Sequence, residues 1–334
     1  MPLIFLDPYP RNEAMVFTDD TREALESLGD LVVHFGSRAP DALVEDILPR
    51  VDVIVGQTAM PRERIDRAPN LKAILNVKAN WEPNIDYAHA QGRGIYVLSS
   101  APVMGMAVAE MALGHAIGLG RGITAGDRAF RAGTERYSID GNGRAYSLHG
   151  AEVGLIGFGN LARDLVPLLA PFRARISVYD PWLSPEYLSR FGVAAAPLDE
   201  VLEKSRFLFI LAGATSENEG FLDRAKLQQI TPDASVMLIS RAEVVDFDAF
   251  VELADSGHFR AAIDVYPEEP APADVPVRTS RNTVLTSHLA GGIHDSYRRM
   301  REWMVDDIRQ VLAGHPPLMM QRAEPRQALL GRSR

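Results

Sequence analysis

Two glycines and a later acid near the middle of the chain have the types and spacing of a phosphate- and ribose-binding site. Gly157 follows an apolar run, and Gly159 lies two positions later. Small Ala162 lies in the helical pattern that begins after Gly159. Such glycines let backbone approach a pyrophosphate, which the free N–H groups of a helix N-terminus favour. Asp180 ends the next apolar run, where a carboxylate can accept hydrogen bonds from ribose hydroxyls. The pattern predicts a dinucleotide site with cofactor contacts from Gly157, Phe158, Gly159, Asn160, Leu161 and Asp180.

Asp180 also bears on which dinucleotide would bind. A 2′-phosphate would meet its like charge, and the residues that follow, Pro181, Trp182 and Leu183, provide no compensating arginine. The sequence therefore favours NAD over NADP.

Short apolar runs alternate with helical patterns along most of the chain, which is typical of parallel sheets with helical crossovers. In the second half, six predicted strands make a dinucleotide-binding fold: 153–156, 176–179, 207–211, 236–239, 261–265 and 283–285. The first hundred residues contain further strands at 3–6, 31–35, 51–55, 71–77 and 95–98. Because 334 residues exceed what one core usually serves, we expect an α/β protein of two domains.

The helical patterns suggest how these strands are connected. We predict a long helix from Met104 to about Arg131, then a glycine-rich polar excursion over 133–142. Asp246 is the expected N-cap of a helix that ends before Gly257. A last helix, apolar at 297, 300, 304, 308 and 311, is expected to pack back on the first domain, and the tail from Gln321 is expected to be loosely ordered.

Composition excludes several classes of function. The formal charge of −9 lacks the basic footprint of a protein that binds nucleic acid or an anionic membrane. With no cysteine, the chain has no disulfide, thiolate metal site or cysteine nucleophile, and no metal site is predicted. The N-terminus lacks the pattern of a signal peptide, so we expect a cytoplasmic protein.

The order of motifs over nearly the whole chain resembles the D-isomer-specific 2-hydroxyacid dehydrogenase family, which includes phosphoglycerate dehydrogenases and glyoxylate or hydroxypyruvate reductases. The resemblance rests on 108–110, 157–162 with Asp180, 240–242, 264–270 and 286–291. It implies a Rossmann NAD-binding domain, 104–290, inserted into a flavodoxin-like substrate-binding domain made of 1–103 and 291–334.

The resemblance also implies catalytic roles. Arg241 would bind the substrate carboxylate and carbonyl, His288 would act as acid and base, Glu269 would orient His288, and Asp264 would hold the nicotinamide carboxamide. The chemistry agrees with these residue types, because reduction of a 2-oxo acid needs a proton donor at the carbonyl oxygen and a fork of N–H groups on the carboxylate. The alternatives are a structural His288, a solvated Glu269, a capping or surface Asp264, and an Arg241 that pairs with Asp246 or Glu243.

Other cofactor contacts are expected at the carboxyl ends of the later strands. They are Leu211, Ala212, Thr215, Ile239, Ser240, Arg241, Asp264, His288 and Ala290. The family usually has glycine after the arginine and proline before the histidine, where this chain has Ala242 and Ser287. Both differences are expected to change only loop stiffness.

The largest departure from the family is the loop that selects the substrate, which here reads Lys78-Ala79-Asn80-Trp81-Glu82-Pro83. By position, the amides of Asn80 and Trp81 would hold the carboxylate, and Lys78 and Trp81 would shape the pocket beyond C3. The alternative is that Trp81 packs in the core and Lys78 is solvated. The predicted substrate-binding residues are Lys78, Ala79, Asn80, Trp81, Arg241 and His288.

Taken together, these features predict an NAD(H)-dependent oxidoreductase that interconverts a D-2-hydroxy acid and its 2-oxo acid. Glyoxylate, hydroxypyruvate or a sugar-derived acid are the expected substrates. The alternative is a protein of the same fold that senses nicotinamide dinucleotides with little or no turnover. We expect a homodimer, with the helix from Met104 and the excursion after Gly133 as its surface.

Overall fold

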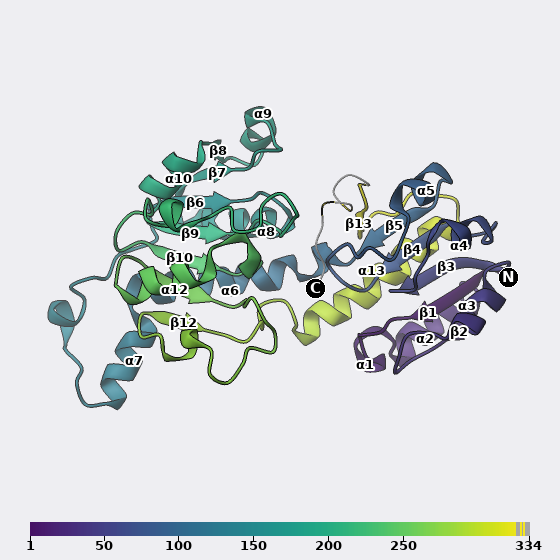
Figure 1. The fold of residues 1–334 in the computed structure, drawn as a ribbon, viewed down its shortest axis with the longest axis horizontal. Helices are drawn as coiled ribbons and strands as arrows, with labels where there is room; N and C mark the ends of the chain where they lie inside the picture. Colours follow the sequence, from purple (N-terminus) through teal and green to yellow (C-terminus); the bar gives the residue numbers. More distant parts are fainter. Residues whose placement is uncertain (325–327, 329, 331–334) are drawn as a thin grey trace. The chain divides into compact units, whose positions relative to one another are not determined.

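The computed structural model describes residues 1–324, 328 and 330, and the chain divides into two compact units. The first unit consists of Met1–Met104 and Gly292–Arg334, and the second of Gly105–Gly291. The expected domain boundaries lie one residue from these positions. Each unit is built on its own sheet (Figure 1).

The sheet of the first unit has the order β13-β5-β4-β3-β1-β2. Its first five strands pair in parallel, which is the flavodoxin-like order expected for this part of the chain. They are β1 (Leu3–Asp7), β2 (Asp30–Val33), β3 (Val51–Gly56), β4 (Ala73–Asn76) and β5 (Tyr96–Ser99). The short β13 (Gln321–Arg322) pairs antiparallel with β5. This pairing corrects the expectation that the tail is loosely ordered from Gln321 onward. Residues 325–327, 329 and 331–334 of the tail lie outside the described residues.

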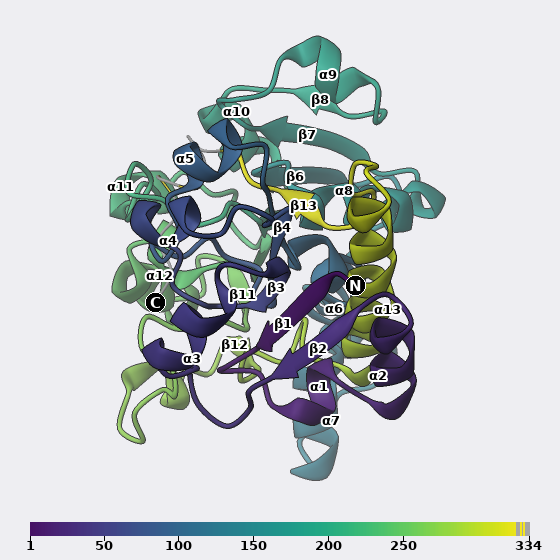
Figure 2. The ribbon, with the colours of Figure 1, turned by 90° about the vertical axis from the view of Figure 1, so that its right-hand side faces the viewer.

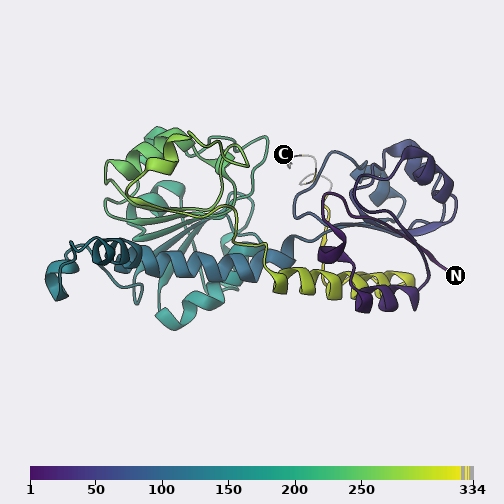
Figure 3. The same cartoon turned by 90° about the horizontal axis from the view of Figure 1, so that it is seen from below.

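Helices cover both faces of this sheet (Figures 2 and 3). One face packs against α3 (Asp41–Ile47), α4 (Arg62–Asp66) and α5 (Tyr87–Gly92). The other packs against α1 (Glu13–Val16), α2 (Asp19–Glu26) and α13 (His294–Leu312). The apolar stripe of α13 lies in this core, so the prediction that the last helix returns to the first domain is confirmed.

The second unit has the sheet order β12-β11-β10-β9-β6-β7-β8, with every pairing parallel. This is the strand order of a Rossmann fold. The strands are β6 (Glu152–Ile156), β7 (Arg175–Tyr179), β8 (Ala194–Ala195), β9 (Phe207–Ile210), β10 (Ser235–Leu238), β11 (Arg260–Ile263) and β12 (Thr283–Leu285). The described strands exceed the six expected because the two-residue β8 is too short to leave a pattern in the sequence.

One face of this sheet packs against α10 (Leu198–Lys204), α11 (Arg224–Leu227) and α12 (Phe247–Asp255). The opposite face carries α6 (Ala101–Arg121) and α8 (Asn160–Leu169), as Figure 3 shows. A short α9 (Pro185–Ser189) precedes β8. Asp246 caps α12 as predicted, because its carboxylate accepts from the backbone N–H of Ala249 at 3.1 Å.

The predicted helix over 104–131 is in fact two helices. Gly122 adopts a φ of +64° between α6 and α7 (Ile123–Arg131), which ends the first helix. The excursion that follows contains a single 3-10 turn, Ser138–Gly141. By length and composition α6 could cross a membrane, but half of its apolar stretch is buried inside the protein, as in a core helix.

Candidate active site

The glycine turn after β6 has the geometry that a pyrophosphate requires. Gly157 has a φ of +89°, and a Cβ at that position would lie 2.7 Å from the Cα of Ala212, so only glycine fits. Helix α8 begins at Asn160, with Gly159 as its N-cap. A Cβ on Gly159 would meet no atom within 4 Å, so a ligand can approach the backbone there. Ala162 is fully buried, which brings the helix close to the sheet.

Asp180 follows β7 and is held beside this turn. Its carboxylate accepts from the backbone N–H of Phe158 at 2.8 Å and from that of Trp182 at 3.0 Å. Because an ionised carboxylate has about four acceptor sites, capacity remains for ribose hydroxyls. The turn and the acid therefore fit a nicotinamide dinucleotide.

His288 and Glu269 form a hydrogen-bonded pair. The Nδ1 atom of His288 lies 2.6 Å from Oε2 of Glu269, and Oε1 of Glu269 accepts from the backbone N–H of Tyr266 at 3.0 Å. This arrangement directs Nε2 of the imidazole toward other partners. The pair lines a hollow of about 710 Å³ within the second unit, so a small molecule can reach it.

The backbone at His288 is in the left-handed region, with a φ of +53°. Asp264, the residue directly after β11, holds this conformation. Its carbonyl accepts from the His288 N–H at 2.8 Å. The fully buried Asp264 carboxylate accepts from the Thr286 hydroxyl at 2.6 Å and from the N–H groups of Leu289 and Ala290 at 2.9 and 3.1 Å. Asp264 is thus an anchor for the loop of His288, a contact that sequence reasoning missed. Its contact with a nicotinamide carboxamide stays a prediction.

Arg241 lies just after β10 and is half-buried. Burial lowers the pKa of its guanidinium, and the nearby carboxylates of Glu243 and Glu269 act in the opposite direction. Its Nη1 donates to the carbonyl of Ser240 at 2.6 Å. The charge of Glu269 is close enough to affect the pKa of Arg241, and the Glu269 carboxylate also contacts His288. The structure therefore brings the three predicted catalytic residues into one region of the second unit.

The loop after β9 is held by two side chains. Ser240 donates from Oγ to the carbonyls of Ile210 and Ala212 at 3.0 and 2.8 Å. Asn218, which sequence reasoning missed, accepts from the Thr215 N–H at 2.7 Å and donates to the Gly213 carbonyl at 2.8 Å. The predicted cofactor contacts Leu211, Ala212, Thr215, Ile239 and Ser240 therefore belong to adjoining strand ends.

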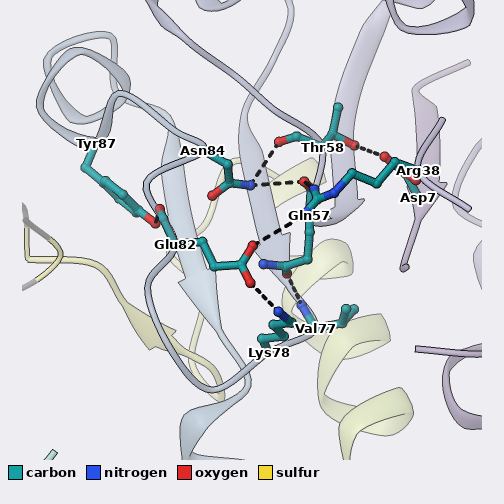
Figure 4. Close-up of polar contacts among 9 residues, drawn as sticks. All are labelled: Asp7, Arg38, Gln57, Thr58, Val77, Lys78, Glu82, Asn84 and Tyr87. Atoms are coloured by element: carbon teal, nitrogen blue, oxygen red, sulfur yellow. Dashed lines mark hydrogen bonds and ion pairs between the residues drawn. The ribbon is translucent and has the colours of Figure 1, made fainter. Parts of the chain in front are cut away.

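The predicted substrate loop belongs to the first unit. The Trp81 side chain is only 8% exposed and packs in the core beside Tyr87, with ring centroids 5.9 Å apart. This packing supports the alternative that Trp81 lies in the core, since burial of the apolar ring is favourable; a role of the ring in shaping the pocket stays a prediction. The amides of Asn80 and Trp81 stay predicted ligands of the carboxylate. Lys78 is not simply solvated, because it contacts the carboxylate of Glu82 (Figure 4).

No group of three or more histidine or acidic residues in the part of the chain that the structure describes could hold a metal ion.

Residues 113–290 match the model of the NAD binding domain of D-isomer specific 2-hydroxyacid dehydrogenases. The chain is 28% identical over 283 residues to the glyoxylate reductase of Pyrococcus furiosus, covering 82% of this chain and 84% of that protein. It is also 28% identical over 271 residues to the D-3-phosphoglycerate dehydrogenase of Mycobacterium tuberculosis strain H37Rv, covering 80% of this chain. That match spans only 50% of the mycobacterial protein.

Among solved structures, a phosphoglycerate oxidoreductase from Rhizobium etli superimposes with a TM-score of 0.88 at 39% identity. The match covers 97% of this chain and 99% of that one. The family match over more than half of the chain and this agreement in fold and sequence lead to one conclusion: the chain belongs to the D-isomer specific 2-hydroxyacid dehydrogenase family.

Proposed function

We propose that the protein is an NAD(H)-dependent oxidoreductase that interconverts a D-2-hydroxy acid and its 2-oxo acid. The observation that carries this proposal is the 2.6 Å contact between His288 and Glu269, in the same unit as the glycine turn and the half-buried Arg241. Relatives named glyoxylate reductase and D-3-phosphoglycerate dehydrogenase support it.

Each catalytic side chain has a role that follows from its surroundings. A bound nicotinamide ring supplies or accepts the hydride. In the reducing direction His288 donates a proton from Nε2 to the substrate's carbonyl oxygen, and Glu269 holds the imidazole by Nδ1 and stabilises its charged form. Arg241 binds the carboxylate and stabilises the charge that develops on the carbonyl oxygen.

The cofactor that we propose is NAD rather than NADP. The carboxylate of Asp180 is held at the glycine turn by two backbone N–H groups, so its negative charge is fixed where a 2′-phosphate would approach. We propose glyoxylate, hydroxypyruvate or a sugar-derived acid as the substrate, bound in part by the loop over 78–81.

We also propose a cytoplasmic homodimer that acts on small molecules and not on nucleic acids or membranes. The apolar surface made of Ile123, Phe130, Tyr137 and Ile139 is exposed and lies on α7 and the excursion after it. A hollow of about 580 Å³ borders this surface within the second unit. Exposed apolar side chains beside a hollow are typical of a surface that binds a second copy of the chain.

The decisive experiment is His288→Asn assayed with NADH and a panel of short and sugar-derived 2-oxo acids. We expect kcat to fall at least about 100-fold, because the proton donor is lost. Binding of NADH, measured by its fluorescence, is expected to persist. His149→Asn, which changes an exposed histidine of the same unit, is the control.

Unchanged turnover in His288→Asn would remove this residue from the mechanism. Tight NADH binding by the unaltered protein, with no turnover of any acid in the panel, would instead favour the dinucleotide sensor.

A further inference from the structure

Charged side chains gather at the carboxyl end of the sheet in the first unit, beside the predicted substrate loop. We call Arg11, Arg38 and Lys78 the basic edge. They follow β1, β2 and β4, respectively. Ligands of open α/β sheets bind outside the carboxyl ends of the strands, so this edge is where a ligand is expected.

Glu82 lies between two members of the basic edge (Figure 4). One oxygen of its carboxylate contacts Nζ of Lys78, and the other lies 3.6 Å from Nη2 of Arg38. The side chain of Glu82 is 9% exposed. Burial raises the pKa of this carboxyl, but Lys78, Gln57 and Arg38 together lower it below its usual range. Glu82 is therefore an anion that holds two cations in place.

The backbone around this pair is fixed by buried amides. Gln57 is fully buried, and its Oε1 accepts from the N–H of Val77 at 3.1 Å, which holds the residue before Lys78. Asn84 donates to the carbonyls of Gln57 and Thr58 at 3.1 and 3.2 Å, which ties the loop after Glu82 to the end of β3. Lys78 thus starts from an ordered strand end and not from a flexible surface loop.

Arg11 brings a third cation to the same strand end. Its Nε donates to the carbonyl of Val77 at 3.4 Å, and its Nη1 donates to the hydroxyl of Tyr297 at 3.1 Å. Asp7, at the end of β1, is buried and accepts from the Thr58 hydroxyl at 2.8 Å. Arg11, Arg38 and Lys78 thus carry three positive charges against the two carboxylates of Asp7 and Glu82, in a chain whose formal charge is −9.

Lys78 has donors to spare. Its ammonium group carries three N–H donors, and the contact with Glu82 uses one of them. Its side chain is 25% exposed, so a ligand can reach the remaining donors. Because Glu82 already orients the ammonium, little conformational entropy would be lost when an anion binds.

We propose that Lys78, oriented by Glu82, binds a second anionic group of the substrate, a carboxylate or a phosphate, at the end of the molecule remote from the 2-oxo acid. This inference rests on the proposed function, because it places the first carboxylate at the amides that follow Lys78. The enzyme would then prefer 2-oxo acids with two acidic groups over those with one. Neither the composition nor the glycine motif indicates this preference.

Two matched pairs of substrates test the proposal in the full chain with NADH. Oxaloacetate is compared with 2-oxobutyrate, and 3-phosphohydroxypyruvate with hydroxypyruvate. The first member of each pair carries an additional acidic group, a carboxylate in oxaloacetate and a phosphate in 3-phosphohydroxypyruvate. We expect kcat/KM to be higher for at least one doubly acidic member. The pair that shows this preference identifies whether Lys78 binds a carboxylate or a phosphate. Lys78→Met is expected to lower that preference about 10- to 100-fold, mainly through KM.

The matched control is Lys72→Met. Lys72 pairs with Asp52 at 2.9 Å just before β4, at the opposite end of the same strand, so the preference is expected to stay as in the unaltered protein. Lys78→Arg keeps the positive charge and is expected to restore most of the preference. Thermal melting and NADH binding check that the variants are folded.

Equal turnover of both members of each pair by the unaltered enzyme would overturn this inference and leave the proposed function standing. An equal loss for both members in Lys78→Met would also overturn it, because Lys78 would then serve the fold or the common 2-oxo acid. Turnover of glyoxylate or of a sugar-derived 2-oxo acid, but of none of these four acids, would overturn the inference alone. Absence of turnover for the four acids, for glyoxylate and for the sugar-derived acids would overturn the proposed function together with the inference.

Discussion

At the scale of single residues, the polar groups of the candidate site are positioned by backbone donors as much as by side chains. The carboxylate of Asp180 accepts from the N–H groups of Phe158 and Trp182. The carboxylate of Asp264 accepts from those of Leu289 and Ala290. Backbone donors fix the direction of a carboxylate without the rotamer freedom of a long side chain, so these acids present their free lone pairs in defined directions.

The position of Asp180 leads to a prediction about cofactor choice. Asp180→Ala removes the negative charge beside the ribose, and we expect the ratio of kcat/KM for NADPH to that for NADH to rise about 10-fold or more. Asp180→Asn separates the effect of the charge from that of the lost hydrogen bond, because it removes the charge but keeps an acceptor for Phe158 N–H. Asp199→Ala, an exposed acid in the first turn of α10, is the control. An unchanged ratio in both Asp180 variants would show that another group sets the preference.

At the scale of elements, the catalytic and substrate loops both follow parallel strands, and each is stabilised by a buried or nearly buried acid. Asp264 anchors the loop after β12, and Glu82 holds the loop after β4. A left-handed residue such as His288 costs conformational energy, which the hydrogen bonds of Asp264 offset. Asp246 also positions backbone, since its carboxylate caps the N-terminus of α12.

Glu82 makes the stability of the first unit depend on pH. Its pKa is lowered on folding, so the ionised form favours the folded state, and the stabilisation is complete above the ordinary value of 4.5 and lost as the pH falls through the lowered value. We expect Glu82→Gln to reduce the free energy of unfolding by about 2 kcal/mol at pH 7. The difference from the unaltered protein should shrink as the pH falls toward 3.

Urea unfolding at a series of pH values measures this difference. Glu26→Gln is the control, because Glu26 is exposed and lies 3.9 Å from Arg22, a pair that contributes little. A difference that stays constant between pH 7 and pH 3 would contradict the role of the Glu82 charge.

At the scale of the whole molecule, the second unit exposes more apolar side chain than its own fold requires. Phe130 is 65% exposed and Ile139 is 75% exposed, although both are large and apolar. A net charge of −9 keeps copies of a protein apart unless a specific surface binds them. Together these features favour a closed dimer over unspecific association.

Light scattering coupled to size-exclusion chromatography tests the dimer. The unaltered protein is expected to elute as a dimer, and Phe130→Glu as a monomer, because burying a charge in an apolar interface is unfavourable. Leu318→Glu changes another exposed apolar residue, in the first unit, and should stay dimeric. A monomeric unaltered protein at micromolar concentration, or a dimeric Phe130→Glu, would rule out this surface as the interface.

The sequence by itself determined the features that repeat at short range. Alternating apolar runs predict the two parallel sheets, and Gly157 with Asp180 predicts the turn beside the acid that the structure contains. The sequence also predicted the packing of α13 from its apolar spacing and the N-cap at Asp246. These features follow from the local geometry of the backbone and from which face of an element is apolar.

Only the tertiary structure decided contacts between residues far apart in the chain. It packed Trp81 into the core, ended α6 at Gly122, added β13 beside β5, and brought Arg38 and Lys78 to one carboxylate. Such outcomes depend on competition among many partners for burial and for a counter-charge. A pattern along the chain records the candidates, and the packed molecule selects among them.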